Sequence, residues 1–427
     1  LLTGTLNRVM IVELGVPASL VALMVAIPVM AAPLRALIGY KSDSAKSLLG
    51  WRRVPYVWFG AMTQFGGLAI MPFALLLFQT QVQGPEWAGP VAAALAFLLT
   101  GLGMHMTQTA GLALATDLAS EESRPRVVAL LYVMMLVGMV ASSLVFAWRL
   151  ESFNPLVLIQ AVQGAAVVTI VLNIIALWKQ EPRRPDLTRF DREIPRFGEA
   201  LKLYRADPAV GRLLLTVGLG AAAFSMQDVL LEPYGGEVLG LSVSQTTLLT
   251  ALWALGTLAG FGIAARASAR AADIYRIAAN GMLIGIVGFC CVIFSEPLAA
   301  PNLFSAGAVI IGLGGGLFSV GTLLAAMDVA RSSERGIAIG VWGAVQATAM
   351  GAALAAGGLV RDGVNASLSA ALGETVLVAP VAGYSVVYHI EIGLLFASLV
   401  AIGPLVGRSR NLSQKQPDKF GLAELPG

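Results

Sequence analysis

The chain has 427 residues, of which 57% are hydrophobic and 12% are charged, and its formal net charge is +3. A soluble domain carries about 25% charged residues, so this composition excludes a water-soluble globular protein. The small net charge is spread over short polar segments and leaves no basic stripe of the kind that binds nucleic acid.

Apolar runs recur along the whole chain and predict an all-α polytopic membrane protein. A membrane-spanning helix needs about 20 apolar residues, and the runs lack the alternation of membrane β-strands. We predict eleven complete spans and one partial first span. Their expected positions are 1–13 (partial), 16–38, 55–79, 87–116, 127–148, 154–178, 209–231, 242–265, 272–295, 302–327, 336–360 and 383–407.

Basic residues are distributed unequally between the two sides of the predicted membrane. Alternate loops and the tail hold 24 of the 28 Lys and Arg residues, whereas the loops of the other side hold only Arg149 and Arg361. The side rich in Lys and Arg is normally cytoplasmic. An even number of spans then places both termini in the cytoplasm.

An internal repeat with an offset of about 211 residues divides the chain into two halves. The sequence GLG at 101–103 recurs at 312–314, Asp117 recurs as Asp328, and Arg124 recurs as Arg335. Repeated halves are typical of transporters, and the repeat predicts a 12-helix fold of the major-facilitator type. The expected parts are a six-helix half at 1–178, a cytoplasmic linker at 179–208, and a second half at 209–427 with a short tail. Because the helix at 209–231 needs an earlier partner, we expect the first helix to be truncated in this chain.

The repeated Asp and Arg residues lie at the cytoplasmic end of the fourth helix of each half. A carboxylate there can bond to the basic groups of a neighbouring loop. The candidates for a latch that breaks during alternating access are therefore Asp117, Arg124, Asp328 and Arg335. Static helix capping is the alternative interpretation.

The loop at 39–55 contributes three further latch candidates, Asp43, Arg52 and Arg53. Its Gly, its Asp and its paired Arg residues resemble the signature loop of major-facilitator proteins. The Arg pair comes about four residues later than in that signature, and this departure puts ordinary loop gating in doubt.

Charged residues near the ends of two repeat-related helices are candidates for a central cavity. Arg8 and Glu13 lie in the first helix, and Asp228 and Glu232 lie in the seventh, where a spacing of four predicts a shared helix face. Interfacial solvation at the helix ends is the alternative, and it is favoured for Glu13 and Glu232.

The glycine cluster at 312–316 invites a nucleotide-binding interpretation, which its context excludes. A dinucleotide-binding loop needs a preceding strand and a solvated helix start, whereas this cluster lies inside an apolar run. We expect these glycines to let membrane helices approach closely.

Several sequence blocks resemble the PucC/LhaA family, also called the bacteriochlorophyll delivery family. They are LNRVMIVELGVPASLV (6–21), APLRALIGYKSD (32–43), LGWRRVPYVWFG (49–60), QFGGLAIMPFAL (64–75) and YHIEIGLLFASLVAIGPLV (388–406). The resemblance implies an assembly factor for the light-harvesting antenna of purple bacteria, somewhat closer to the core-antenna (LH1) branch than to the peripheral one (LH2). It also implies a place in the bacterial inner (intracytoplasmic) membrane.

The same resemblance implies bacteriochlorophyll as cargo or bound pigment. The implied partners are the antenna α and β polypeptides. Further implied partners are a reaction centre–LH1 assembly intermediate, pigment-synthesis enzymes and membrane lipids. The magnesium of the pigment takes one axial ligand, commonly an imidazole. The two histidines of the chain, His105 and His389, both fall in predicted spans, and together with Gln108 and Glu391 they are the candidates for pigment binding. An interhelical hydrogen bond is the alternative for each histidine.

Two non-enzymatic functions are compatible with these motifs. The chain contains no pair of aspartates at the spacing a prenyltransferase uses to hold Mg²⁺ and diphosphate, so we do not expect an enzyme or a further metal site. The first function is the assembly factor. The second is a secondary transporter of a small solute or pigment precursor, which would need a titratable carboxylate in the middle of the bilayer.

Overall fold

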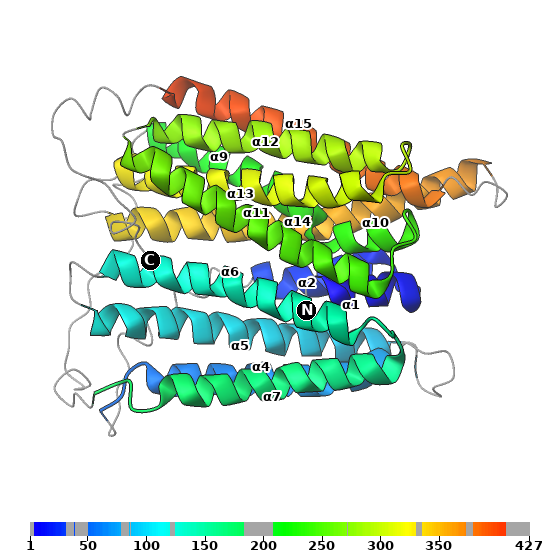
Figure 1. The fold of residues 1–427 in the computed structure, drawn as a ribbon, viewed down its shortest axis with the longest axis horizontal. Coiled ribbons are helices and arrows are strands. Elements are labelled where there is room, and N and C mark those ends of the chain that lie inside the picture. Colours follow the sequence, from blue (N-terminus) through cyan, green and yellow to red (C-terminus); the bar gives the residue numbers. More distant parts are fainter. Residues whose placement is uncertain are drawn as a thin grey trace.

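The computed structural model describes residues 4–30, 38, 50–77, 85, 87–119, 124–182, 208–270, 272–329, 335–372 and 379–406. Helices make up nearly all of this part of the chain, and they lie side by side along one common direction (Figure 1). In the first half they are α1 (Thr5–Arg8) with the π-helical turn Val9–Glu13, α2 (Ala18–Met30), α4 (Val54–Leu76), α5 (Ala88–Leu118), α6 (Arg124–Arg149) and α7 (Pro155–Leu177).

The second half contains the remaining helices. They are α9 (Pro208–Ser225), the 3₁₀ turn η3 (Met226–Val229), α10 (Leu231–Glu237), α11 (Val243–Ala269), α12 (Ile274–Ser295), α13 (Pro301–Val329), α14 (Arg335–Leu372), α15 (Ala379–Ile402) and the 3₁₀ turn Gly403–Leu405. Within the described residues, ten helical segments are long and apolar enough to cross a membrane, and α2 is a shorter apolar helix. The predicted all-α polytopic fold is confirmed.

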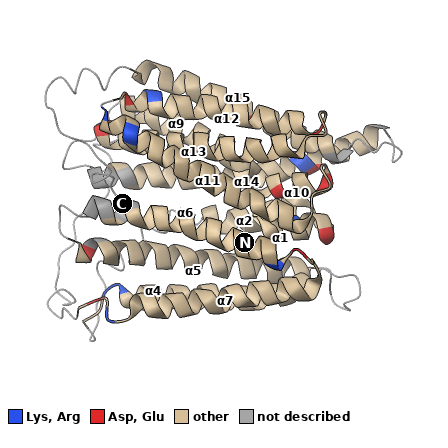
Figure 2. Cartoon of the chain, in the orientation of Figure 1, with Lys and Arg blue, Asp and Glu red and all other residues tan. Residues whose placement is uncertain are grey.

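Charged residues gather at the two ends of the helices and are rare in the middle of the bundle (Figure 2). We call the end that carries Arg52, Asp117 and Glu181 the linker side, and the end that carries Gly15, Gly240 and Arg361 the far side. The linker side is the one that the Lys and Arg distribution predicts to be cytoplasmic.

Three predicted boundaries were wrong. Helix α14 continues to Leu372 instead of ending near residue 360, because Arg361 and Asp362 both find polar partners there. Helix α15 begins at Ala379, four residues before the predicted start at residue 383. The seventh span breaks at the 3₁₀ turn η3 and resumes as α10, so Asp228 and Glu232 do not share the face of one continuous α-helix.

Some predictions fall outside the described residues. These are the latch candidate Asp43, the linker at 183–207 and the tail from residue 407 onward. The described positions likewise do not include the side chains of Arg124 and Arg335.

The repeated glycines of α13 let three helices pack backbone to backbone. A methyl group at Gly312 would overlap the backbone carbonyl of Trp253 on α11, and one at Gly314 would lie 2.5 Å from the carbonyl oxygen of Gly281 on α12. Since no side chain fits in either place, these positions accept only glycine. The predicted packing role of the cluster is confirmed.

The corresponding glycines of α5 make the corresponding contacts in the first half. Gly101 packs against Pro28 of α2, and Gly103 packs against the backbone of Gln64 on α4. The loops after the first and seventh spans also match, because Gly15 and Gly240 adopt the same left-handed conformation, with φ of 64° and 65°. The same local packing therefore recurs in both halves of the bundle.

The halves meet through two interfaces that the repeat relates to each other. Helix α2 packs against α14, and helix α6 packs against α11. The first of these contacts is tight, because a methyl group at Gly358 would lie 2.6 Å from the carbonyl oxygen of Ala18. The first helix adds a third contact on the far side, where Thr5 and Thr247 lie within 3.1 Å.

Candidate functional site

Helix α15 has two chemically different faces. One face is buried and carries Tyr384, Tyr388 and Glu391, whose exposed fractions are 0–1%. His389 lies on the opposite, exposed face, because residues two apart on a helix point about 200° apart. His389 and Glu391 therefore do not form one site, contrary to the expectation from their closeness in sequence.

The imidazole of His389 has a defined tautomer. Its Nδ1 lies 2.7 Å from the backbone carbonyl oxygen of Ser385, one turn earlier. A carbonyl oxygen only accepts, so Nδ1 carries the proton and Nε2 has a free lone pair. Metal-binding histidines are commonly oriented in this way, with one ring nitrogen donating to a backbone carbonyl and the other facing the metal.

The surroundings of His389 are apolar and open. A shallow groove of about 540 Å³ follows α15 and is lined by Ala382, Ser385, Val386, His389 and Ile390. One turn further along, a methyl group placed on Gly393 would meet nothing within 4 Å. Phe396 and Val400 continue the same face with exposed fractions of 53% and 77%. A flat ring bound through Nε2 would thus find free space on one side of the histidine and an apolar track beyond it.

His105 has a different environment on α5. It is 7% exposed, and its Nε2 donates to the backbone carbonyl of Pro28 on α2, 3.0 Å away. Its repeat partner Gly316 packs against the carbonyl of Thr257 on α11, so both halves use this position for a helix contact. The geometry therefore favours the interhelical hydrogen bond for His105. Gln108, one turn away, is partly buried on the same helix.

Arg8, one of the charged residues expected in a central cavity, instead ties the first helix to the second half. Arg8 is 4% exposed; it pairs with Glu13 at 2.5 Å and donates to the backbone carbonyl of Leu241 at 3.1 Å. Glu232 is also 4% exposed and accepts a hydrogen bond from Thr250 at 2.6 Å. The expectation that Glu232 is solvated at a helix end was wrong, since neighbouring helices cover that end.

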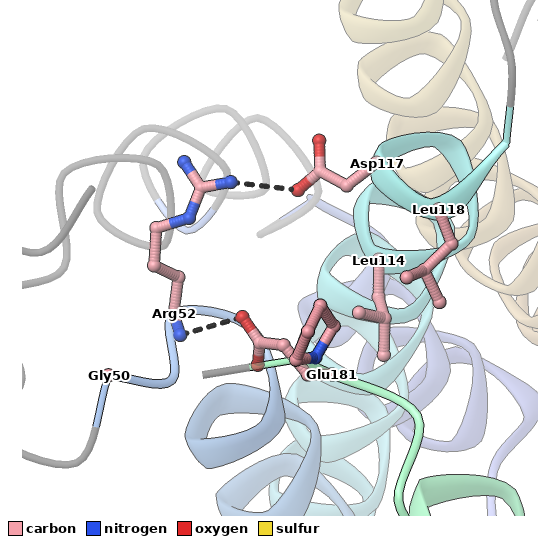
Figure 3. A pocket seen from close by; sticks show the side chains of 7 residues that line it. Gly50, Arg52, Leu114, Asp117, Leu118 and Glu181 are labelled. Atoms are coloured by element: carbon pink, nitrogen blue, oxygen red, sulfur yellow. Dashed lines mark hydrogen bonds and ion pairs between the residues drawn. The ribbon is translucent and has the colours of Figure 1, made fainter. Parts of the chain in front are cut away.

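On the linker side, three latch candidates converge with Glu181, which the sequence did not single out. Figure 3 shows two of them, Arg52 and Asp117, beside Glu181. Asp117, near the end of α5, accepts from the guanidinium groups of Arg52 and Arg53 at 3.2 and 3.1 Å. Glu181 follows α7 and accepts from the backbone N–H groups of Arg52, Arg53 and Val54. It thus caps the start of α4, where four N–H groups lack intrahelical partners. A pocket of about 210 Å³ lies between these side chains.

This cluster joins helices of the same half. Arg52 precedes α4, Asp117 lies near the end of α5 and Glu181 follows α7, so the bond of Asp117 to a neighbouring basic segment forms within the first half. Asp328, the repeat partner of Asp117, is exposed at the end of α13.

A contact between the halves lies on the far side and was not predicted. Asp362 of α14 accepts a hydrogen bond of 2.7 Å from the backbone N–H of Ser19, in the first turn of α2. Arg361 bonds Asp362 at 2.8 Å and also pairs with Glu237, which in turn accepts from the hydroxyl of Tyr384 at 2.9 Å. The one signal in the sequence was that Arg361 is the repeat partner of Arg149; nothing pointed to Glu237 or Asp362.

We expect Asp362→Ala to lower the stability of the protein by about 1–2 kcal/mol, because the start of α2 loses its acceptor. Asp362→Asn keeps an acceptor oxygen of the same shape and should lose clearly less. Thermal unfolding of both variants in the same detergent measures the difference. Equal losses in the two variants would mean that the charge of Asp362, and not its bond to Ser19, stabilises the contact.

The comparisons with known proteins agree on the family. Residues 5–410 match the family described as PUCC protein. The chain belongs to the PUCC protein family. It is 55% identical, over 100% of its own length and 90% of the relative, to a protein of Rhodobacter capsulatus named "Uncharacterized protein in puhA-bchM intergenic region". It is 50% identical to "Protein PucC" of the same organism, over 96% of this chain and 89% of the relative.

Solved structures that resemble this PUCC family member are transporters of the major-facilitator fold. A bacterial homologue of the lysosomal transporter Spinster, in an inward-facing conformation, superposes with a TM-score of 0.72 at 14% identity, covering 98% of this chain and 95% of that one. A D-xylose–proton symporter superposes with a TM-score of 0.68 at 16% identity, covering 96% and 94%. At these identities the likeness establishes the fold alone, and the predicted major-facilitator fold is confirmed.

Proposed function

We propose that the protein is a non-enzymatic assembly factor for the light-harvesting antenna of purple bacteria, and that its client is LH1 in preference to LH2. In this role it binds antenna α and β polypeptides within the membrane and holds bacteriochlorophyll for them. Membership of the PUCC family and the names of its relatives support the photosynthetic setting. The proposed location is the inner membrane, with both termini in the cytoplasm, in agreement with the distribution of Lys and Arg.

The observation that carries the pigment-holding part is the geometry of His389. Its Nε2 lone pair faces outward from the bundle and its tautomer is held by the carbonyl of Ser385. A polar side chain that faces lipid is costly and needs a functional reason. Binding of a magnesium macrocycle would supply that reason. The imidazole nitrogen would be a ligand for the magnesium, and the neighbouring apolar groove would contact the apolar ring.

The residues of this face have separable roles. His389 would supply the ligand nitrogen, Gly393 would leave clearance beside the ligand, and Phe396 and Val400 would contact a long apolar tail. The site opens sideways toward the membrane, so pigment could pass to a neighbouring single-span polypeptide without crossing water. This lateral opening supports delivery to an antenna polypeptide.

The test is the near-infrared absorption of the tagged protein, purified in mild detergent from a strain that makes bacteriochlorophyll but no antenna polypeptides. We expect a bacteriochlorophyll band that stays with the protein through size-exclusion chromatography. A folded and colourless protein would rule out pigment holding. Purification from two further strains, one with only LH1 polypeptides and one with only LH2 polypeptides, identifies the client by which polypeptides co-purify.

A secondary transporter is the second candidate function, and two observations favour it. Glu391 lies buried near the middle of the span Val381–Leu405, where such a transporter would need a titratable carboxylate. The seventh span is discontinuous at η3, and broken helices form the substrate and ion sites of many transporters.

An enzymatic function has less support. One relative, 28% identical over 85% of this chain, is named "Bacteriochlorophyll synthase 44.5 kDa chain". The described residues do not supply the clustered aspartates with which a prenyltransferase holds Mg²⁺ and diphosphate.

A further inference from the structure

Glu391 is a carboxylate in the middle of a membrane span. It lies ten residues after the start and fourteen before the end of the segment Val381–Leu405. Its exposed fraction is 0%, and neither of its oxygens has a hydrogen-bond partner among the described residues. The backbone N–H of Gln227 faces the carboxylate but lies outside hydrogen-bond geometry for either oxygen.

A second carboxylate, that of Asp228, lies close enough to Glu391 for the two charges to repel each other. Asp228 belongs to the 3₁₀ turn η3, which packs against α15. Its Oδ1 accepts a hydrogen bond of 2.8 Å from the side chain of Gln227. It also keeps some exposure, whereas Glu391 has none.

Other polar groups around Glu391 do not neutralise it. The hydroxyl of Tyr388, one turn earlier on α15, is buried without a partner among the described residues. The ring of Tyr234 packs edge-on against the rings of Tyr384 and Tyr388. Arg361 is paired with Glu237 and Asp362. None of the ion pairs formed by described residues includes Asp228, Glu232 or Glu391.

An isolated negative charge in this position would be very costly, and two neighbouring negative charges would be more so. A proton on one carboxyl removes both penalties, as in other carboxylate pairs that share one proton. We propose that Glu391 and Asp228 form a proton-binding pair in which Glu391 holds the proton and Asp228 holds the charge. The side-chain amide of Gln227 donates a hydrogen bond of 2.8 Å to Asp228, whereas only the backbone N–H of Gln227 approaches Glu391, outside hydrogen-bond geometry.

The position of the pair suits it to couple a proton to movement of the halves. Turn η3 contacts α2 of the first half and α14 of the second, and a methyl group at Gly357 of α14 would lie 2.7 Å from the carbonyl oxygen of Met226 in η3. Removal of the proton would place a second charge beside the contacts that η3 makes with α2 and α14. The pair with its proton therefore stabilises the packed arrangement of the helices, and the pair without its proton destabilises it.

This proposal does not rest on pigment binding, and its test uses another signal. The full chain is purified from a strain that makes no bacteriochlorophyll, since pigment carbonyl groups would overlap the infrared region of interest. At neutral pH we expect the carbonyl-stretch band of a protonated carboxylic acid, shifted in D₂O. Glu391→Gln should lose the band, while the exposed control Glu296→Gln and the hydrogen-bonded Glu232→Gln should keep it.

Folding is controlled by the choice of variant. A protonated Glu and a Gln are both neutral and nearly equal in shape, so Glu391→Gln should unfold at the same temperature as the wild type. Absence of the band from the wild type, or its survival in Glu391→Gln, would overturn the proposal. Loss of the band when Na⁺ or K⁺ is added at constant pH would also overturn it, because the pair would then be a metal-cation site.

Discussion

We expect His389→Ala to lose the bacteriochlorophyll band that the wild-type protein retains, and His105→Ala to keep it. The two histidines differ in which nitrogen is free: His389 presents Nε2 outward, whereas the Nε2 of His105 donates to Pro28. Removal of the single axial ligand leaves only apolar contacts with the ring. The near-infrared spectrum of each variant, at equal protein concentration, measures the loss.

Two controls separate loss of the ligand from loss of the fold. His389→Gly leaves a space that added imidazole can occupy, so imidazole should restore the band. Leu359→Ala removes an exposed apolar side chain from another helix, α14, and should not change the band. If His105→Ala removes the band and His389→Ala does not, the pigment lies between α2 and α5 and the assignment to α15 is wrong.

The second large effect is expected at Gly312, where Gly312→Ala should prevent normal packing of the second half. Its methyl group would overlap the backbone carbonyl of Trp253 on α11, and a backbone cannot move aside as a flexible side chain can. Overpacking in a tight core costs about 1–3 kcal/mol, and we expect the upper end of that range. The measurements are the yield of monodisperse protein and its unfolding temperature in detergent.

Gly315→Ala is the matched control on the same helix. A methyl group there would lie 3.6 Å from the ring of Phe224, which is an ordinary contact, so this variant should behave like the wild type. The same substitution is made three residues away, and helix propensity therefore changes equally in both variants. Equal stability of the two variants would show that α11 and α13 are less tightly packed than described.

Much of the fold could be predicted from the sequence because the relevant signals are local. The apolar runs predicted the membrane helices, and the recurrence of GLG predicted the close contacts that α5 and α13 make in the two halves. The errors occurred where a polar contact overrides hydropathy. Arg361 and Asp362 extend α14 beyond its apolar run because both are satisfied by partners on other helices.

The candidate sites depended more on the tertiary structure. The sequence identified Asp117, Arg52 and Arg53 as one group, and they do meet. It could not show that Glu181 joins them, because a capping carboxylate after α7 lies 128 residues from the N–H of Arg53 that it binds. Nor could it show that the contact between the halves uses Asp362 and Ser19, which are 343 residues apart.

The sequence by itself determined that this protein crosses the membrane many times, that its halves repeat, and that it belongs to the PUCC protein family. Only the tertiary structure decided which polar side chains face lipid and which face the interior of the bundle. The physical reason is that lipid and protein interior are both apolar, so hydropathy assigns the same value to either face of a membrane helix. His389 and Glu391 are two residues apart, and the packing of α15 alone places one toward the membrane and the other beside Asp228.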